Sequence, residues 1–213
     1  MTIERRFSPR ASAPVSIERR ADGPAMIVGY ASVFYDGTPE TEYQLWDGYV
    51  ERIMPGAFDR AIREDDVRGL FNHDPDHLLG RTLAETLRLS VDQRGLRYEI
   101  EPPDTQLGRD LVASIERGDL TGSSFAFTVT DEVWRVVEEV HIREIEGVRL
   151  YDVGPVTYPA YEATTTGLRS ELEARCAAAQ PKIPRDKAAI ARRARLVEAS
   201  ERLGEPLTGC EAG

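Results

Sequence analysis

Short segments in which apolar and polar residues alternate recur through the middle of this sequence, a pattern typical of half-buried β-strands. The clearest segment is LTGSSFAFTV, residues 120–129. Side chains of a strand point alternately to its two faces, so one face carries Ser123, Phe125 and Phe127 and the other Ser124, Ala126 and Thr128. The aromatic face is the predicted core face. The opposite face carries only small residues, which indicates that something lies against it.

The pattern predicts a mainly β (α+β) fold for the body of the chain, residues 23–166, in which a β-barrel or strongly curved sheet is flanked by a few helices. AMIVGYASVF is an apolar, β-branched run, and RLSVDQRGLRYEIEP predicts a hairpin that turns at residues 92–95. DTQLGRDLVASIERGDL predicts a helix capped by Asp104 or Thr105 and ended by Gly118. PGAFDRAIRED predicts a short one.

The two ends of the chain differ from the body. Residues 1–22 show no sustained periodicity and are interpreted as a flexible N-terminal arm. Residues 167–213 are interpreted as a linker and a helical tail, rich in Ala, Arg and Glu and interrupted by Pro181 and Pro184, which is mobile or removed by self-cleavage. Both ends have a slight excess of basic residues, so the acidic excess lies in the body.

Composition excludes several function classes. The net charge of −10 argues against a nucleic-acid-binding protein, which needs clustered Lys and Arg. No segment has the roughly 18 consecutive apolar residues of a membrane span, and the N-terminus lacks the apolar stretch of a secretory signal. Cys176 and Cys210 form neither a disulfide framework nor a metal-binding motif, so a reducing cytoplasm is expected.

Three histidines supply the candidate general bases: His73, His77 and His141. His73 lies in FNHDPDH, where a predicted strand gives way to a loop, a position that suits a catalytic residue and equally a surface histidine. HDPDH also permits a zinc site, and hence a metal-dependent hydrolase. Pro75 argues against it, because it prevents the helical turn that would place His73 and His77 on one face.

Ser124 is the candidate nucleophile, and an ordinary solvated hydroxyl is the alternative. The sequence has neither the GxSxG motif of the α/β-hydrolases nor a phosphate-binding loop. A nucleophilic serine needs a base, a group that orients the base, and donors for the oxyanion. A β-rich body with one suitably placed histidine and several acids can supply these, and the residues alone lead no further.

Six segments resemble, in order and with compatible spacing, the prohead proteases of tailed phages, over roughly residues 23–166. They are IVGYASVF, MPGAFDRAI, FNHDPDHLLGRT, RGLRYEIEP, RGDLTGSSFAF and LYDVGPVTYPAYEAT.

These serine peptidases are related in fold to the herpesvirus assemblins, so the resemblance implies a β-barrel flanked by helices. It further implies an endopeptidase that removes the scaffolding part of the major capsid protein, or a separate scaffold, and commonly cleaves itself. The expected location is the host cytoplasm, inside the immature capsid. No cofactor, metal, nucleic acid or membrane partner is implied, and because assemblins dimerise, a homodimer is expected.

The family's catalytic residues fall on three positions of this sequence. Its motif serine corresponds to Ser124 in SSFAF, its NH-motif histidine to His73, and its acidic third member to Asp152 in LYDVGPV. The resemblance implies that His73 takes the Ser124 proton while Asp152 orients the imidazole. Glu144 is the competing third member. Backbone amides near Gly80 and Arg81 are the oxyanion donors considered, with a structural role as the alternative for Arg81.

Three departures from the family pattern bear on activity. Ala126 replaces a glycine, Asp152 is one methylene shorter than the usual glutamate, and Gly154 stands where the family often has serine. These departures keep a second hypothesis open, a catalytically inactive capsid-assembly factor of the same fold.

Overall fold

Two β-sheets form most of the described part of the chain, which in the computed structural model comprises residues 2–8, 14–19, 23–158 and 166–179. The chain divides into two units, Met1–Gln180 and Pro181–Gly213, and the fold below is that of the first. Of the two helical pieces expected on either side of Pro181 and Pro184, the first is present as α3 (Thr166–Ala179), and the second lies with Cys210 outside the described residues.

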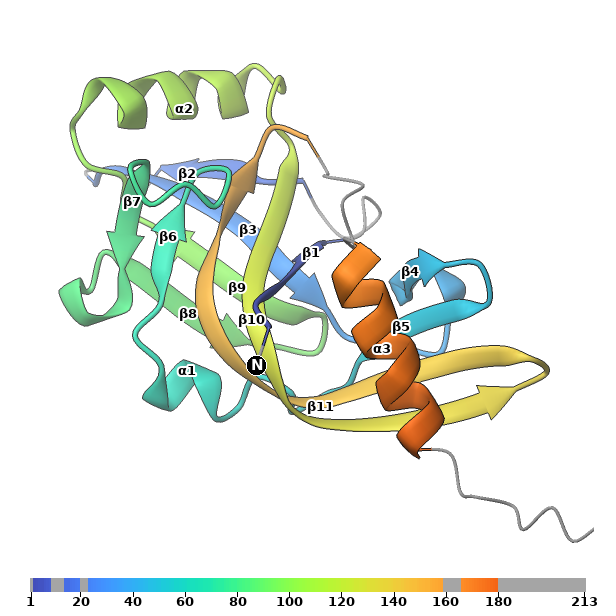
Figure 1. The fold of residues 1–213 in the computed structure, drawn as a ribbon. Coiled ribbons are helices and arrows are strands. Elements are labelled where there is room, and N and C mark those ends of the chain that lie inside the picture. Colours follow the sequence, from blue (N-terminus) through green and yellow to red (C-terminus); the bar gives the residue numbers. More distant parts are fainter. Residues whose placement is uncertain (1, 9–13, 20–22, 159–165, 180–213) are drawn as a thin grey trace, which may run out of the picture. The chain divides into compact units, whose positions relative to one another are not determined.

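The first sheet is built around a long antiparallel hairpin of β10 and β11 (Figure 1). Its main path runs β1 (Glu4–Phe7), β10 (Gly122–Val137), β11 (Val140–Val156), β5 (Tyr49–Ile53) and β4 (Tyr43–Trp46). β11 also pairs in parallel with β6 (Arg68–Leu70), which pairs with β7 (Leu78–Arg81). β11 is thereby flanked by three other strands, and it brings residues distant in sequence next to the serine strand.

The second sheet has four antiparallel strands, in the order β2 (Ser16–Arg19), β3 (Ala25–Val33), β9 (Gly95–Ile100) and β8 (Leu87–Val91). The predicted hairpin is confirmed as β8 and β9. Its turn is held by Asp92, whose carboxylate accepts hydrogen bonds from the amides of Arg94 and Gly95, as short polar side chains do in turns.

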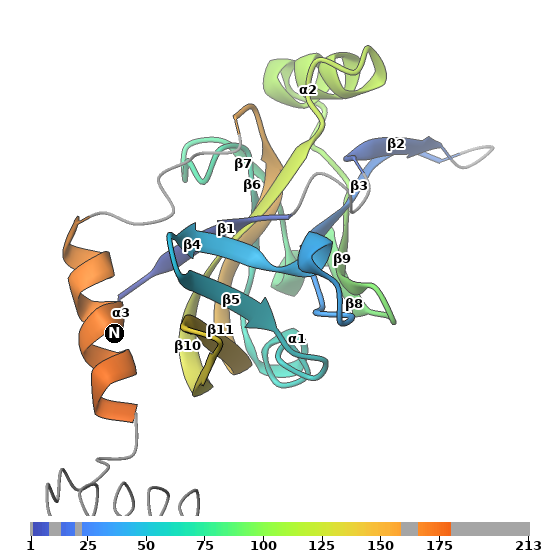
Figure 2. The same ribbon diagram turned by 90° about the vertical axis from the view of Figure 1, so that its right-hand side faces the viewer.

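The helices are few, as expected. They are α1 (Ala61–Glu64), α2 (Gln106–Glu116) and α3 (Thr166–Ala179), with 3-10 turns η2 (Pro39–Thr41) and η3 (Thr82–Ala84). In α2 the Gly108 amide donates to the Thr105 hydroxyl at 3.2 Å, the expected N-cap, and Gly118 with φ +81° follows its end. Figures 1 and 2 show α2 across one end of the fold beside β2.

Helix α3 packs against the first sheet. Leu172 is fully buried and clusters with Leu45 of β4 and with Trp134. Arg175 pairs with Glu132 of β10 at 2.8 Å, and Figure 2 shows the helix beside the ends of β1 and β4. An apolar contact and an ion pair thus hold residues 169–179, part of the segment expected as a mobile or self-cleaved tail, against the sheet.

The core lies between the two sheets and contains the predicted aromatic face. The Phe125 and Phe127 rings stack at 4.7 Å, and Phe58 meets Phe125 edge-on at 5.7 Å. The mainly β class is confirmed, but the sheets are not closed into a barrel. In the described residues β1, β4 and β7 are the edge strands of one sheet and β2 and β8 those of the other, with no hydrogen-bonded ladder joining the two sheets.

Two parts of residues 1–22, the segment expected as a flexible arm, form strands in the structure. Glu4–Phe7 and Ser16–Arg19 form β1 and β2, one in each sheet. In β1 the buried side chains are the charged Glu4 and Arg6, so no apolar alternation marks this strand in the sequence. None of the helices in the described residues is both long and apolar enough to span a bilayer.

Candidate active site

Ser124 lies on β10 with its side chain on the face opposite the two core phenylalanines. Its cross-strand partner on β11 is Gly154, and the partner of Ala126 is Asp152. Directly opposed residues share a face of a sheet, so Ser124 and Asp152 are diagonal neighbours on one face. Ser123 points the other way, into the core, and its hydroxyl bonds the Tyr98 hydroxyl at 2.8 Å.

His73 is held beside these two residues by an unusual backbone conformation. Asn72 and His73 have φ of +56° and +58°, in the left-handed region that few non-glycine residues adopt. Asn72 fixes the loop to the end of β11: its amide donates to the Pro155 carbonyl at 3.1 Å, and its side-chain oxygen accepts from the Thr157 amide at 2.9 Å. Strained residues that neighbouring contacts hold in place are concentrated at functional sites.

Three side chains meet in a line across this face. His73 Nδ1 lies 2.5 Å from Asp152 Oδ1, and His73 Nε2 lies 2.5 Å from Ser124 Oγ. The side chains of His73 and Asp152 are only 8% and 12% exposed. With Asp152 accepting from Nδ1–H, the Nε2 lone pair faces the serine hydroxyl, which is the arrangement that lets an imidazole withdraw a hydroxyl proton. The predicted triad residues are thus brought together.

Comparison with known proteins identifies the family of this chain. A family model described as caudovirus prohead serine protease matches residues 13–176. This chain belongs to the caudovirus prohead serine protease family. A solved structure, the capsid assembly protease gp21 of bacteriophage T4, aligns with a TM-score of 0.40 and 15% identity over 74% of this chain and 97% of that one. No curated protein matches the chain significantly.

In this member of the prohead protease family, the competing acid Glu144 lies elsewhere. Its carboxylate accepts from Arg135 at 2.6 Å and lies 3.9 Å from Arg52. In the strand register, Glu144 stands opposite Arg52 of β5, whereas Asp152 stands opposite Arg68 of β6. Strand β6 leads into the His73 loop. Glu144 is therefore separated from His73 by its position along β11.

Gly154, one of the departures from the family pattern, has a steric reason. A Cβ at this position would lie 2.0 Å from the carbonyl oxygen of Leu70 in β6. Any side chain, serine included, would push β6 away and move the His73 loop that follows it. Gly154 therefore allows β6 to approach β11 closely.

Of the two backbone amides expected as oxyanion donors, that of Arg81 already has a hydrogen-bond partner. The Arg81 amide donates to the Thr86 hydroxyl at 3.0 Å, and its guanidinium pairs with Asp66 at 2.6 Å. Gly80 stands opposite Gly69 in the β6–β7 ladder. The Arg81 side chain therefore links β7 to the segment before β6 through an ion pair.

His77 does not join His73. Its side chain is 44% exposed and its nearest acidic partner is Asp74, at 3.3 Å, while both ring nitrogens of His73 face Ser124 and Asp152. Within the described residues, no group of three or more His, Cys, Asp or Glu side chains is arranged to hold a metal ion.

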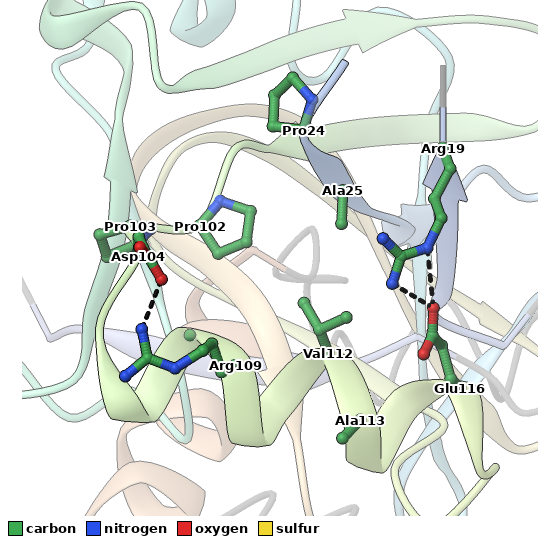
Figure 3. Close-up of a pocket in the computed structure, with 11 residues that line it drawn as sticks. Arg19, Pro24, Ala25, Pro102, Pro103, Asp104, Arg109, Val112, Ala113 and Glu116 are labelled. Atoms are coloured by element: carbon green, nitrogen blue, oxygen red, sulfur yellow. Dashed lines mark hydrogen bonds and ion pairs between the residues drawn. The ribbon is translucent and has the colours of Figure 1, made fainter. Parts of the chain in front are cut away.

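A surface hollow of about 370 Å³ lies away from the three residues, beside α2. Figure 3 shows Pro102 and Val112 in its lining and the Arg19–Glu116 ion pair across it. None of the triad residues lines this hollow.

The sequence did not reveal what covers Ser124. Strand β1 lies beside β10 as the next strand of the sheet, with Phe7 opposite Ser124 and Arg5 opposite Ala126. Ser124 is fully buried, and its hydroxyl donates to the Arg6 carbonyl at 2.9 Å. The four residues of β1 carry no sequence signal that they lie beside Ser124. Their placement depends on contacts with residues 118 positions away in the chain.

Proposed function

We propose that this chain is the serine endopeptidase of phage capsid maturation, acting through Ser124, His73 and Asp152. The observation that carries the proposal is the pair of 2.5 Å contacts that His73 makes with the other two residues. Membership of a serine protease family whose members act in proheads supports it. The proposed substrates are the scaffolding part of the major capsid protein and the chain itself, inside the immature capsid, and a homodimer is expected.

Each residue has a distinct role in the proposed mechanism. Ser124 Oγ attacks the scissile carbonyl while its proton passes to His73 Nε2. His73 then delivers that proton to the leaving amine, and water repeats the sequence on the acyl-enzyme. Asp152 holds the Nδ1–H tautomer and stabilises the imidazolium, which is favourable at a site with little exposure to water. No cofactor takes part.

Replacing Ser124 tests this function. In co-expression with the cognate capsid protein, we expect Ser124→Ala to leave both chains uncut, because loss of a triad member lowers the rate by about 10⁴- to 10⁶-fold. Intact mass analysis reports capsid cleavage and self-cleavage together.

Ser123→Ala is the matched control. It removes the buried hydrogen bond to Tyr98 at a cost of about 1–3 kcal/mol of stability, and processing continues. Cleavage that persists in Ser124→Ala, or that is lost only in Ser123→Ala, would contradict the assignment.

The complete burial of Ser124 favours a second candidate, a capsid-assembly factor of this fold that cuts nothing. A fluorophosphonate, which reacts only with an activated serine, separates the two candidates. The peptidase becomes labelled at Ser124 and the assembly factor does not.

A further inference from the structure

Strand β1 stands where an extended peptide would bind if Ser124 is the nucleophile. It is an edge strand of the first sheet and runs antiparallel to β10 from Glu4–Phe127 to Phe7–Ser124 (Figures 1 and 2). The Ser8 amide continues the ladder to the Ser123 carbonyl at 3.0 Å. Extended peptides commonly bind by adding a strand to a sheet edge, and without β1 the exposed edge would be β10 itself.

The Arg6 carbonyl competes with His73 for the serine proton. A serine hydroxyl has one proton to donate, and Ser124 Oγ has two acceptors in reach, Arg6 O at 2.9 Å and His73 Nε2 at 2.5 Å. When the proton points to Arg6, the base cannot withdraw it. With Ser124 fully covered, no carbonyl of another chain can reach the hydroxyl while β1 is in place.

The Arg6 side chain is held by a buried carboxylate. It lies on the core face of the sheet, where its Nε and Nη2 reach the two oxygens of Glu51 at 2.8 and 2.9 Å. The side chains of Arg6 and Glu51 are 3% and 0% exposed. A two-point guanidinium–carboxylate contact at low exposure strongly distinguishes arginine from a neutral residue.

The charges of β1 allow the strand to leave without leaving an unpaired charge buried in the protein. β1 brings one acid and one base, Glu4 and Arg6, into a buried cluster with Glu51 and Arg143. Once both have left, Arg143 still contacts Glu51 at 2.8 Å and Glu132 at 2.7 Å. Removal of one partner of a buried pair is costly, whereas removal of a balanced pair is not.

We propose that the β10 edge beside Ser124 is the substrate-peptide site, that β1 occupies it as an internal inhibitor, and that Glu51 selects arginine at the residue whose carbonyl meets Ser124. The proposal rests on the proposed peptidase function. A substrate peptide enters as an antiparallel strand after β1 leaves, and follows the path that β1 takes now.

Loosening β1 in the full chain tests the inhibition. The double variant Glu4→Gln/Arg6→Gln keeps the shape of the strand and removes its balanced charges, so we expect fluorophosphonate to label Ser124 at least tenfold faster than in wild type. Arg5→Gln is the matched control, since Arg5 is the exposed basic residue of the same strand, and its labelling rate stays at the wild-type value. Equal labelling of the double variant and wild type overturns the inhibition and leaves the peptidase function standing. No labelling in either chain overturns both.

A reversible disulfide between β1 and β10 tests the inhibition if the double variant does not fold. Arg5 and Ala126 are directly opposed, at a separation that suits a disulfide, so Arg5→Cys/Ala126→Cys can fix β1 in place. We expect the oxidised protein to resist labelling and the same protein to regain it on reduction. Equal rates in the two states would show that β1 does not control access.

Peptides test the role of Glu51. On the double variant, TIERRFSP, the sequence of residues 2–9, is expected to protect Ser124 from labelling at a concentration at least tenfold lower than the peptide with Arg6→Gln. The peptide with Arg5→Gln is the control and protects like the parent. Equal protection by all three would overturn the selection of arginine.

Discussion

Ser123 and Ser124 are neighbours in the chain, but their hydroxyls take part in different interactions. Ser123 bonds Tyr98 in the core, where burial raises the pKa of the tyrosine and keeps it neutral. Ser124 bonds His73 and the Arg6 carbonyl. Alternation along one strand separates a packing role from a chemical one, so a change at one serine need not affect the other.

Asp152 can be tested against Glu144 as the acid of the triad. We expect Asp152→Asn to lower the peptidase rate by about 10⁴-fold with little change in stability, because the amide fits the site but no longer holds the reactive histidine tautomer. Cleavage of capsid protein under matched enzyme concentration is the measurement.

Glu144→Gln serves as the control. It weakens contacts to Arg135 and Arg52, neither of which touches His73. Its rate should stay at the wild-type value. A larger loss in Glu144→Gln than in Asp152→Asn would reverse the assignment.

At the scale of elements, β1 depends on ion pairs more than on apolar packing. Burial by itself raises the pKa of Glu4, but hydrogen bonds and charge from Arg143 and Arg6 outweigh burial and leave the pKa below its usual range. The charged form of Glu4 is thus favoured by folding, and the docking of β1 is coupled to pH.

Acid is therefore expected to weaken the contribution of Glu4. Because its pKa in the folded chain is depressed, this stability is fully present above the ordinary glutamate pKa of about 4.3 and is lost as pH falls through the folded value. The difference in unfolding free energy between wild type and Glu4→Gln, from urea titrations at several pH values, should shrink below about pH 4. A difference that stays constant with pH would show that the Glu4 charge contributes nothing.

At the scale of the whole molecule, α3 belongs to the folded unit. Leu172 is fully buried against β4, and the Cys176 sulfur lies 3.2 Å from Nδ1 of His141 in β11. The family match ends at residue 176, inside this helix. The folded unit therefore extends beyond residue 166, where the alternating pattern of the sequence stops.

Two truncations test where the folded unit ends. A chain ending at Gln180 should keep the wild-type melting temperature and labelling rate. A chain ending at Thr165 loses the burial of Leu172, worth about 1.5–3 kcal/mol, and should melt several degrees lower. Equal melting temperatures for the two chains would mean that α3 does not contribute to the fold.

The local features could be predicted from the sequence: the two faces of β10, the turn at Asp92, the cap and end of α2, and the motifs that mark His73, Ser124 and Asp152. These depend on residues close together in the chain. The three-dimensional fold was needed to see that the sheets stay open, that Asp152 and not Glu144 meets His73, and that β1 covers Ser124. Each of these depends on which strands lie side by side, and the alternation within a strand does not identify a partner that is distant in the chain.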